Sequence, residues 1–191
     1  MAAIQIVNEE TLSDKKYPLK YITLQKPDRE GNMRQQQKEV YYRADAVSIL
    51  LVDKQARKFL FTRQFRLAAF LNGSDSGYLL EACAGIIDKT ETPEQTAARE
   101  VMEETGYEIS GLEKTGAVYT SPAGITEYVH LFVANYKSES SHAKRGGLAS
   151  EGEDIELVEM DFDEALQKLQ SGQIKDAKTL MLLQHYFWAN K

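Results

Sequence analysis

A cluster of glutamates between Gly85 and Tyr107 is the part of this chain best suited to chemistry; the segment is G-I-I-D-K-T-E-T-P-E-Q-T-A-A-R-E-V-M-E-E-T-G-Y. Glu100, Glu103 and Glu104 are spaced i, i+3, i+4, so on a helix they share one face. Like charges at that spacing repel one another, and the C-terminal half of a helix disfavours anions. Carboxylate oxygens held in this way suit Mg²⁺ or Mn²⁺, which in turn bind phosphates. The spacing therefore predicts a divalent-cation site rather than the alternative, a solvated acidic face.

The residues around this cluster carry the signals of one short helix. Thr92 is a good N-cap, Pro93 suits the first helical position, and Gln95 completes a capping box. Gly106 is typical of a helix C-terminus. We therefore predict a helix over residues 93–105 that holds the acids on one face.

The segment resembles the signature of the Nudix hydrolases, G-x5-E-x7-R-E-U-x-E-E-x-G-U, in which U is a bulky aliphatic residue. The matching positions are Gly85, Glu91, Arg99, Glu100, Val101, Glu103, Glu104 and Gly106. Only the last position departs, because Tyr107 is aromatic, and we expect this side chain to pack rather than to take part in chemistry. A match at so many fixed positions is a specific signal.

Composition limits the class of protein and its partners. With 191 residues the chain can form one domain with a sizeable core, and its net charge of −6 argues against nucleic acid as a partner. Cys83 is the only cysteine, which fits a reducing cytosol. The N-terminus shows no signal peptide, and the longest apolar stretch, residues 46–52, is too short to span a membrane. We therefore expect a cytoplasmic protein with no membrane partner.

The pattern of apolar residues predicts an α/β fold. Strands are expected at residues 21–24, 40–42, 46–52, 58–62, 78–82, 118–120, 129–136 and 155–160, and further helices at 162–169 and 178–188. This order indicates a mixed sheet between helical layers, and the Nudix resemblance implies the same α/β/α sandwich. We expect residues 44–191 to form this Nudix hydrolase domain and residues 1–43 to form a small antiparallel β region. Residues 137–153 are almost without apolar side chains, which is typical of a functional or disordered loop.

Motifs outside the signature are similar to the branch of the family that acts on ADP-ribose and nucleotide sugars. They are Arg63-Gln64-Phe65-Arg66, Pro122, and the acidic segment 147–155. Lys38-Glu39-Val40-Tyr41 and Lys178-Thr179 are more similar to GDP-mannose pyrophosphatases in particular. The resemblance extends from about Leu12 to Tyr186. It implies Mg²⁺-dependent hydrolysis of a nucleotide sugar, GDP-mannose above all, to GMP and mannose 1-phosphate.

The resemblance also implies a set of site residues. Mg²⁺, or Mn²⁺ in its place, would be held by the backbone carbonyl of Ala84 and by the carboxylates of Glu100, Glu104 and Glu153. Substrate would be bound by Tyr17, Gln37, Lys38, Glu39, Arg66, Ala84, Gly85, Ile86, Glu104, Glu127, Gly152, Glu153 and Lys178. Arg99 would orient the carboxylates, with Glu91 as its partner. The base that activates water would be Glu151 or Glu153, and the sequence leaves both open.

A homodimer follows from the same resemblance. Tyr17 and residues 37–39 would reach the site from a partner subunit, and exchanged strands would explain why the polar segment 1–43 has no core of its own. Simpler roles stand beside these assignments: Arg66 and Lys178 as ordinary surface cations, Tyr17 as a packing residue, Glu127 as an acid paired at a strand end.

Three other functions are alternatives, the first within the same class of enzyme and the other two from different classes. An ADP-ribose pyrophosphatase would give AMP and ribose 5-phosphate. A non-catalytic Nudix module that only binds a nucleotide would be free to lose its metal ligands, yet all three signature glutamates are present. RNA decapping is disfavoured by the negative charge and the lack of a basic stripe.

Overall fold

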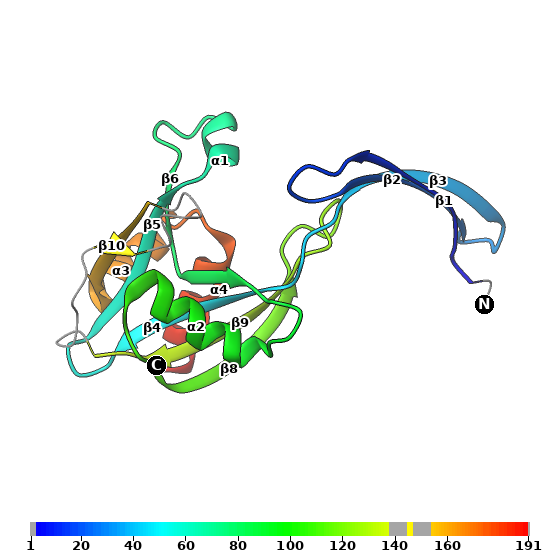
Figure 1. Ribbon diagram of the computed structural model, residues 1–191. Helices are drawn as coiled ribbons and strands as arrows, with labels where there is room; N and C mark the ends of the chain where they lie inside the picture. The colour runs from blue at the N-terminus through cyan, green and yellow to red at the C-terminus, as the bar shows by residue number, and fades with distance from the viewer. Residues whose placement is uncertain (1–2, 138–144, 147–153, 191) are drawn as a thin grey trace. The chain divides into compact units, whose positions relative to one another are not determined.

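The computed structural model describes residues 3–137, 145–146 and 154–190. The chain forms two compact units (Figure 1). Met1–Asp45 and Tyr119–Tyr128 form the first unit, and Ala46–Val118 and Val129–Lys191 form the second. In the described part of the chain, no helix is long and apolar enough to cross a membrane.

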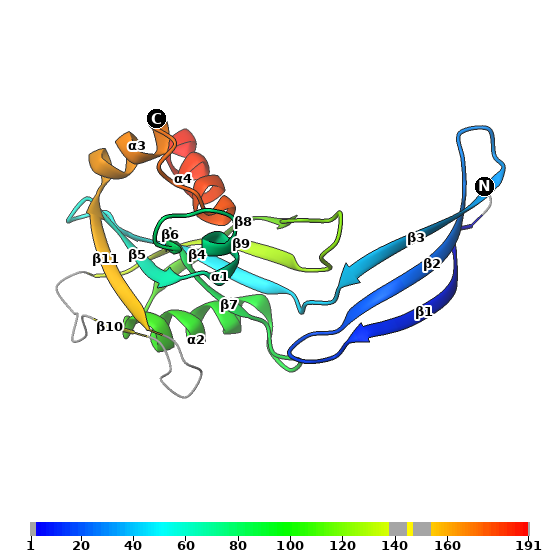
Figure 2. The same cartoon turned by 90° about the horizontal axis from the view of Figure 1, so that it is seen from above.

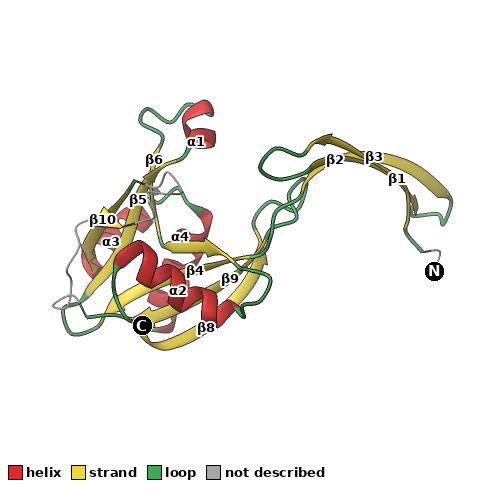
Figure 3. Cartoon of the chain, viewed as in Figure 1, coloured by secondary structure: helices red, strands yellow, loops and turns green. Residues whose placement is uncertain are grey.

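The first unit contains a three-stranded antiparallel sheet in the order β1-β2-β3 (Figure 3). Its strands are β1 (Gln5–Ser13), β2 (Leu19–Pro27) and β3 (Met33–Tyr41). The expected strands at 21–24 and 40–42 fall in β2 and β3, whereas β1 was not predicted. β1 is exposed over almost its whole length, and its apolar residues Ile6, Val7 and Leu12 do not alternate with polar ones, so its sequence lacks the pattern by which a half-buried strand is recognised.

The second unit contains an eight-stranded sheet in the part of the chain that the structure describes. Its strands are β4 (Ala46–Asp53), β5 (Lys58–Phe65), β6 (Tyr78–Glu81), β7 (Cys83–Ile86), β8 (Ser110–Tyr119), β9 (Tyr128–Asn135), β10 (Arg145–Gly146) and β11 (Ile155–Asp161). The main order is β10-β11-β5-β4-β9-β8, with β6 paired to β5 and β7 paired to β4. β4 runs parallel to β9 and antiparallel to β5 and β7, so the sheet is mixed.

The central strand β4 separates two cores, and this makes the unit an α/β/α sandwich. Leu50 and Val52 face the core that is shared with α3 (Phe162–Gln170) and α4 (Ala177–Ala189). Ile49 and Leu51 point to the opposite core, which α2 (Pro93–Thr105) covers. Figure 2 shows α2 on one side of the sheet and α3 and α4 on the other. Each fully buried aliphatic side chain of β4 contributes on the order of 1.5–3 kcal/mol through removal of apolar surface from water. A short helix, α1 (Leu67–Leu71), links β5 to β6.

Helix α2 occupies the predicted residues, and its ends have the predicted causes. The Thr92 hydroxyl accepts a hydrogen bond from the Gln95 amide, and the Gln95 side chain accepts one from the Thr92 amide, which completes the capping box. Gly106 ends the helix in the left-handed conformation at φ 72°. Tyr107 is buried against Tyr136, with ring centroids 5.0 Å apart, which confirms the expectation that it packs.

Candidate active site

Glu100 on α2 lies directly against the backbone of β7 at Gly85, in space that a side chain at that position would occupy. A Cβ atom added at Gly85 would lie 1.8 Å from Glu100 Cδ and 2.1 Å from its Oε1. A side chain at this position would therefore displace the Glu100 carboxylate, and glycine leaves room for it. The side chain of Glu100 is only 15% exposed, and the strand therefore fixes where its oxygens lie.

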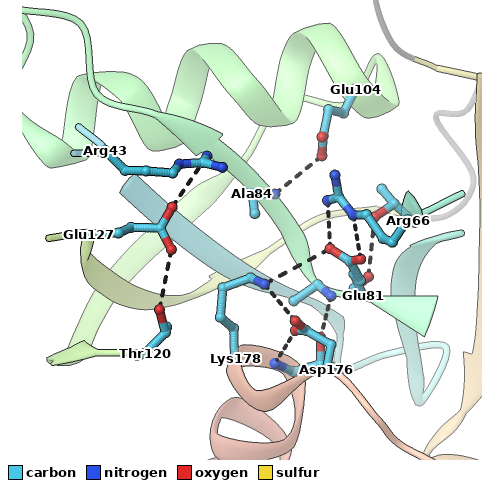
Figure 4. A network of polar contacts seen from close by, with 12 residues as sticks. Arg43, Arg66, Glu81, Ala84, Glu104, Thr120, Glu127, Asp176 and Lys178 are labelled. Carbon is cyan, nitrogen blue, oxygen red and sulfur yellow. Dashed lines mark hydrogen bonds and ion pairs between the residues drawn. The ribbon is translucent and has the colours of Figure 1, made fainter. Parts of the chain in front are cut away.

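Glu104 follows one turn later on the same helix and faces the same strand. It is buried, and its Oε2 accepts a hydrogen bond of 3.3 Å from the Ala84 amide (Figure 4). Two carboxylates and the peptide that carries the Ala84 carbonyl are thus brought together by α2 and β7. A buried carboxylate is costly unless a positive group compensates it, and hard oxygen donors are the set that Mg²⁺ prefers.

Arg99 holds three acids of the signature in place. Its guanidinium makes ion pairs with Glu91 at 3.0 Å, Glu100 at 2.9 Å and Glu103 at 2.8 Å. The hydrogen bonds to Glu91 are the main reason why the pKa of Arg99 is raised above its usual range. They also lower the pKa of Glu91, with a smaller effect from the Thr96 hydroxyl, which donates to Glu91 at 2.8 Å. The predicted pair of Arg99 with Glu91 is present, and Glu103 steadies the cluster through the same arginine.

Arg66, the residue directly after β5, is bound by a buried acid that sequence analysis did not single out. Its Nε and Nη2 each donate to a carboxylate oxygen of Glu81 at 2.7 Å. The hydrogen bonds to Glu81 are the largest cause of a raised pKa of Arg66, and the charge of Glu104 adds to them. Arg66 therefore interacts electrostatically with Glu104, one of the carboxylates of helix α2.

Lys178 lies in the first turn of α4 and shares the same acid. Its Nζ is 2.5 Å from Asp176 Oδ1 and 3.9 Å from Glu81 Oε2. Figure 4 shows the side chains of Arg66, Lys178, Glu81 and Asp176 converging from different elements. Arg66 and Lys178, two of the predicted substrate-binding residues, are thus brought to one pair of acids, so neither is an isolated surface cation.

A second group of predicted residues gathers in the first unit. The Arg43 guanidinium lies 4.7 Å from the ring centroid of Tyr17 and 3.3 Å from Glu127 Oε1. Glu127 also accepts a hydrogen bond of 3.3 Å from Thr120. Glu127, just before β9 begins, is therefore paired with Arg43 and Thr120. The guanidinium of Arg43 also makes a cation–π contact with the ring of Tyr17. The sequence missed Arg43, since an arginine outside the signature gives no signal until the fold brings it to Tyr17 and Glu127.

The remaining predicted residues are placed as follows. Gln37, Lys38 and Glu39 are exposed on β3, opposite Thr23, Ile22 and Tyr21 of β2. The carbonyl of Ile86 accepts a hydrogen bond of 3.4 Å from Arg99. Glu151, Gly152 and Glu153 lie outside the described residues.

The described residues supply part of the expected metal site. Among the described residues, no group of three or more histidine, cysteine, aspartate or glutamate side chains could hold a metal ion. The predicted site takes only two such side chains from the described part, Glu100 and Glu104, with the carbonyl of Ala84 and with Glu153. The close approach that Gly85 permits and the hard oxygen chemistry of these donors fit Mg²⁺.

Comparison with known proteins identifies a family and relatives that this chain resembles. The NUDIX domain family matches residues 42–183. Proteins named GDP-mannose pyrophosphatase from Cronobacter sakazakii and Escherichia coli are 41% and 40% identical over 182 residues, which cover 95% of this chain and 94% of each relative. A crystal structure of an ADP compounds hydrolase superposes with a TM-score of 0.73 over 98% of this chain and 94% of its own, at 18% identity, a likeness of fold.

Proposed function

This chain belongs to the Nudix hydrolases, and we propose that it hydrolyses the pyrophosphate bond of GDP-mannose to GMP and mannose 1-phosphate. The observation that carries the proposal is the similarity to GDP-mannose pyrophosphatases over 95% of the chain. That similarity extends beyond residues 42–183, the part that the family pattern matches, and so takes in most of the N-terminal sheet. Magnesium is the proposed cation, with Mn²⁺ as a possible substitute.

The cation would be held by Glu100, Glu104, the Ala84 carbonyl and Glu153. When bound, Mg²⁺ neutralises charge on the diphosphate and makes a bound water more acidic. The contribution of this chain is to fix the oxygens: Gly85 lets Glu100 approach the strand, and Arg99 holds the Glu100 carboxylate at 2.9 Å. Fixed ligands need no rearrangement when substrate arrives, which favours catalysis.

Arg66 and Lys178 are the proposed ligands of the diphosphate. A planar guanidinium matches two phosphate oxygens, whereas an ammonium acts as a compact point charge. In the reaction, a water oxygen bonds to one phosphorus of the anhydride and the bond from that phosphorus to the bridging oxygen breaks. Glu151 or Glu153 takes the proton of the attacking water.

We also propose a homodimer, in which Tyr17 and residues 37–39 serve the site of the partner subunit. The three-stranded sheet supports this, because Ile6 and Val7 of its outer strand β1, and Ile4 just before that strand, are between 54% and 66% exposed. Apolar side chains gathered on an exposed strand mark an association surface. Light scattering at micromolar protein should give twice the mass of the 21.6 kDa chain, and the mass of a monomer would refute the proposal.

The function is tested by phosphate release with alkaline phosphatase as coupling enzyme, since only the cleaved products carry phosphomonoesters. GDP-mannose and ADP-ribose are compared with Mg²⁺ and with EDTA, and Glu100→Gln is the matched inactive variant. Activity on GDP-mannose that needs Mg²⁺ and Glu100 supports the proposal. A preference for ADP-ribose would keep the chemistry and overturn the substrate. A folded protein inactive on both would contradict the proposal and favour a nucleotide-binding module.

A further inference from the structure

Glu81 is a buried acid that has no part in the Nudix signature. It ends β6, two residues before β7 begins, and is only 2% exposed. Both of its carboxylate oxygens accept hydrogen bonds of 2.7 Å from Arg66, and Lys178 Nζ lies 3.9 Å from Oε2 (Figure 4). A carboxylate in such a place persists only when cations compensate it, so Glu81 and these two cations depend on one another.

Asp176 holds the second cation and is itself held at three points. Its Oδ1 binds Lys178 Nζ at 2.5 Å, while Oδ2 accepts from the Thr179 amide at 2.9 Å and the Thr179 hydroxyl at 2.7 Å. The same hydroxyl accepts a hydrogen bond of 2.7 Å from the Ala82 amide. Because Ala82 follows Glu81 in the chain, these bonds connect the N-terminus of α4 to the strand that carries the acid.

The geometry points to a role for this cluster beyond stability. The bonds to Glu81 use Nε and Nη2 of Arg66, so the edge that carries Nη1 is turned away from the acid. The side chain of Arg66 is 42% exposed and that of Lys178 is 20% exposed, so both cations remain open to solvent while their acid is not. We propose that Glu81 is a positioning residue which, with Asp176, fixes Arg66 and Lys178 in the orientation that receives the diphosphate. This inference rests on the proposed function.

Two physical effects of Glu81 on substrate binding have opposite signs. Its negative charge weakens the attraction of the two cations for phosphate, so as a mere counter-ion it would raise KM. Its hydrogen bonds fix long side chains that would otherwise lose rotamer freedom on binding, so as a positioning residue it lowers KM. Because Arg66 is held by two short parallel bonds, we expect positioning to win.

The test is a double-mutant cycle on the intact enzyme with GDP-mannose and Mg²⁺. We expect Glu81→Gln, which keeps the shape of the side chain, to raise KM about tenfold, equivalent to ~1.4 kcal/mol, with kcat within about threefold of wild type. In an Arg66→Gln background the same change should raise KM by much less, because its main partner is gone. Glu159→Gln is the control: it breaks the 3.2 Å ion pair with Lys58 on the same sheet and should leave both constants unchanged.

A second variant keeps the inference testable if Glu81→Gln does not fold. Asp176→Asn removes the partner of Lys178, and since asparagine caps helices as well as aspartate does, α4 should stay intact. We expect KM to rise severalfold in this variant too. An unchanged or lowered KM in Glu81→Gln would show that the acid is only a counter-ion. A loss of kcat of a hundredfold or more at constant KM would place Glu81 in the chemical step, and either result overturns the inference.

Failure of the proposed function can be distinguished from failure of this inference about Glu81. It appears in the wild-type enzyme as a lack of Mg²⁺-dependent turnover of GDP-mannose, before any variant is compared. Positioning would then be tested by calorimetric binding of GDP with Mg²⁺. Weaker binding to Glu81→Gln by fivefold or more, with Glu159→Gln equal to wild type, supports the inference, and equal affinities overturn it.

Discussion

Replacement of Gly85 by alanine would test the geometry of the metal-binding helix most sharply. The new Cβ would lie 1.8 Å from Glu100 Cδ, 2.1 Å from Oε1 and 2.3 Å from Cγ. To restore an ordinary contact of 3.4 Å, the Glu100 carboxylate would have to retreat by about 1.6 Å. Arg99 holds that carboxylate at 2.9 Å, so its displacement also disturbs the other acids that Arg99 binds. A misplacement of ~1 Å can cost ~100-fold in rate, and we therefore expect kcat/KM to fall at least ~100-fold.

Stability should change far less than activity. Overpacking of this kind costs about 1–3 kcal/mol, or roughly 2–4 °C in Tm for each kcal/mol in a protein of this size. The assay is coupled phosphate release from GDP-mannose with Mg²⁺, with Tm followed by circular dichroism. Gly116→Ala is the matched control, since a Cβ at that glycine of β8 meets nothing within 4 Å. Activity of Gly85→Ala within threefold of the control, at an unchanged Mg²⁺ requirement, would refute the reasoning.

The remaining predictions concern single side chains of the same segment. Glu104→Gln should lower kcat by at least ~100-fold with its circular dichroism spectrum unchanged, because it removes a proposed Mg²⁺ ligand; near-normal turnover at saturating Mg²⁺ would contradict this. Thr92→Ala should lower Tm by a few degrees, since loss of an N-cap costs ~1 kcal/mol, and an unchanged Tm would show that the capping box contributes nothing. The pKa of Glu91 is lowered from 4.5, so its stabilisation is present above that pH and is lost as the pH falls through the folded pKa. The difference in unfolding free energy between wild type and Glu91→Gln should therefore be constant near pH 7 and shrink below pH 4.5, and a difference that grows in acid would be the wrong sign.

Local sequence signals predicted α2 completely, because a capping box, a proline and a terminal glycine act within a few residues of the helix. Strand β4 was predicted for a similar reason, since it carries a run of apolar residues that is buried on both faces. Strand β7 and most of β8 were not predicted. The position of Glu100 against Gly85 was not predicted, because it depends on how α2 packs on β7.

Residues whose role depends on distant partners could not be predicted. Glu81 precedes the signature and has the appearance of an ordinary strand-end acid, and its burial between Arg66 and Lys178 exists only once β5, β6 and α4 have packed. Strands β4 to β8 and helices α1 and α2 separate Arg43 from Glu127 along the chain, so their ion pair leaves no local pattern. Strand β1 could not be predicted for the same reason, because its structure depends on pairing with β2 and not on its own composition.

The identity of the substrate is the central claim, and the ratio of kcat/KM for GDP-mannose to that for ADP-ribose tests it most directly. Both substrates should be measured on one preparation, with saturating Mg²⁺ and an EDTA blank. We expect this ratio to exceed ten with Mg²⁺, and we expect activity on both substrates to be lost in EDTA. A ratio below one would contradict the account, because the enzyme would then prefer the other substrate class at the same metal site.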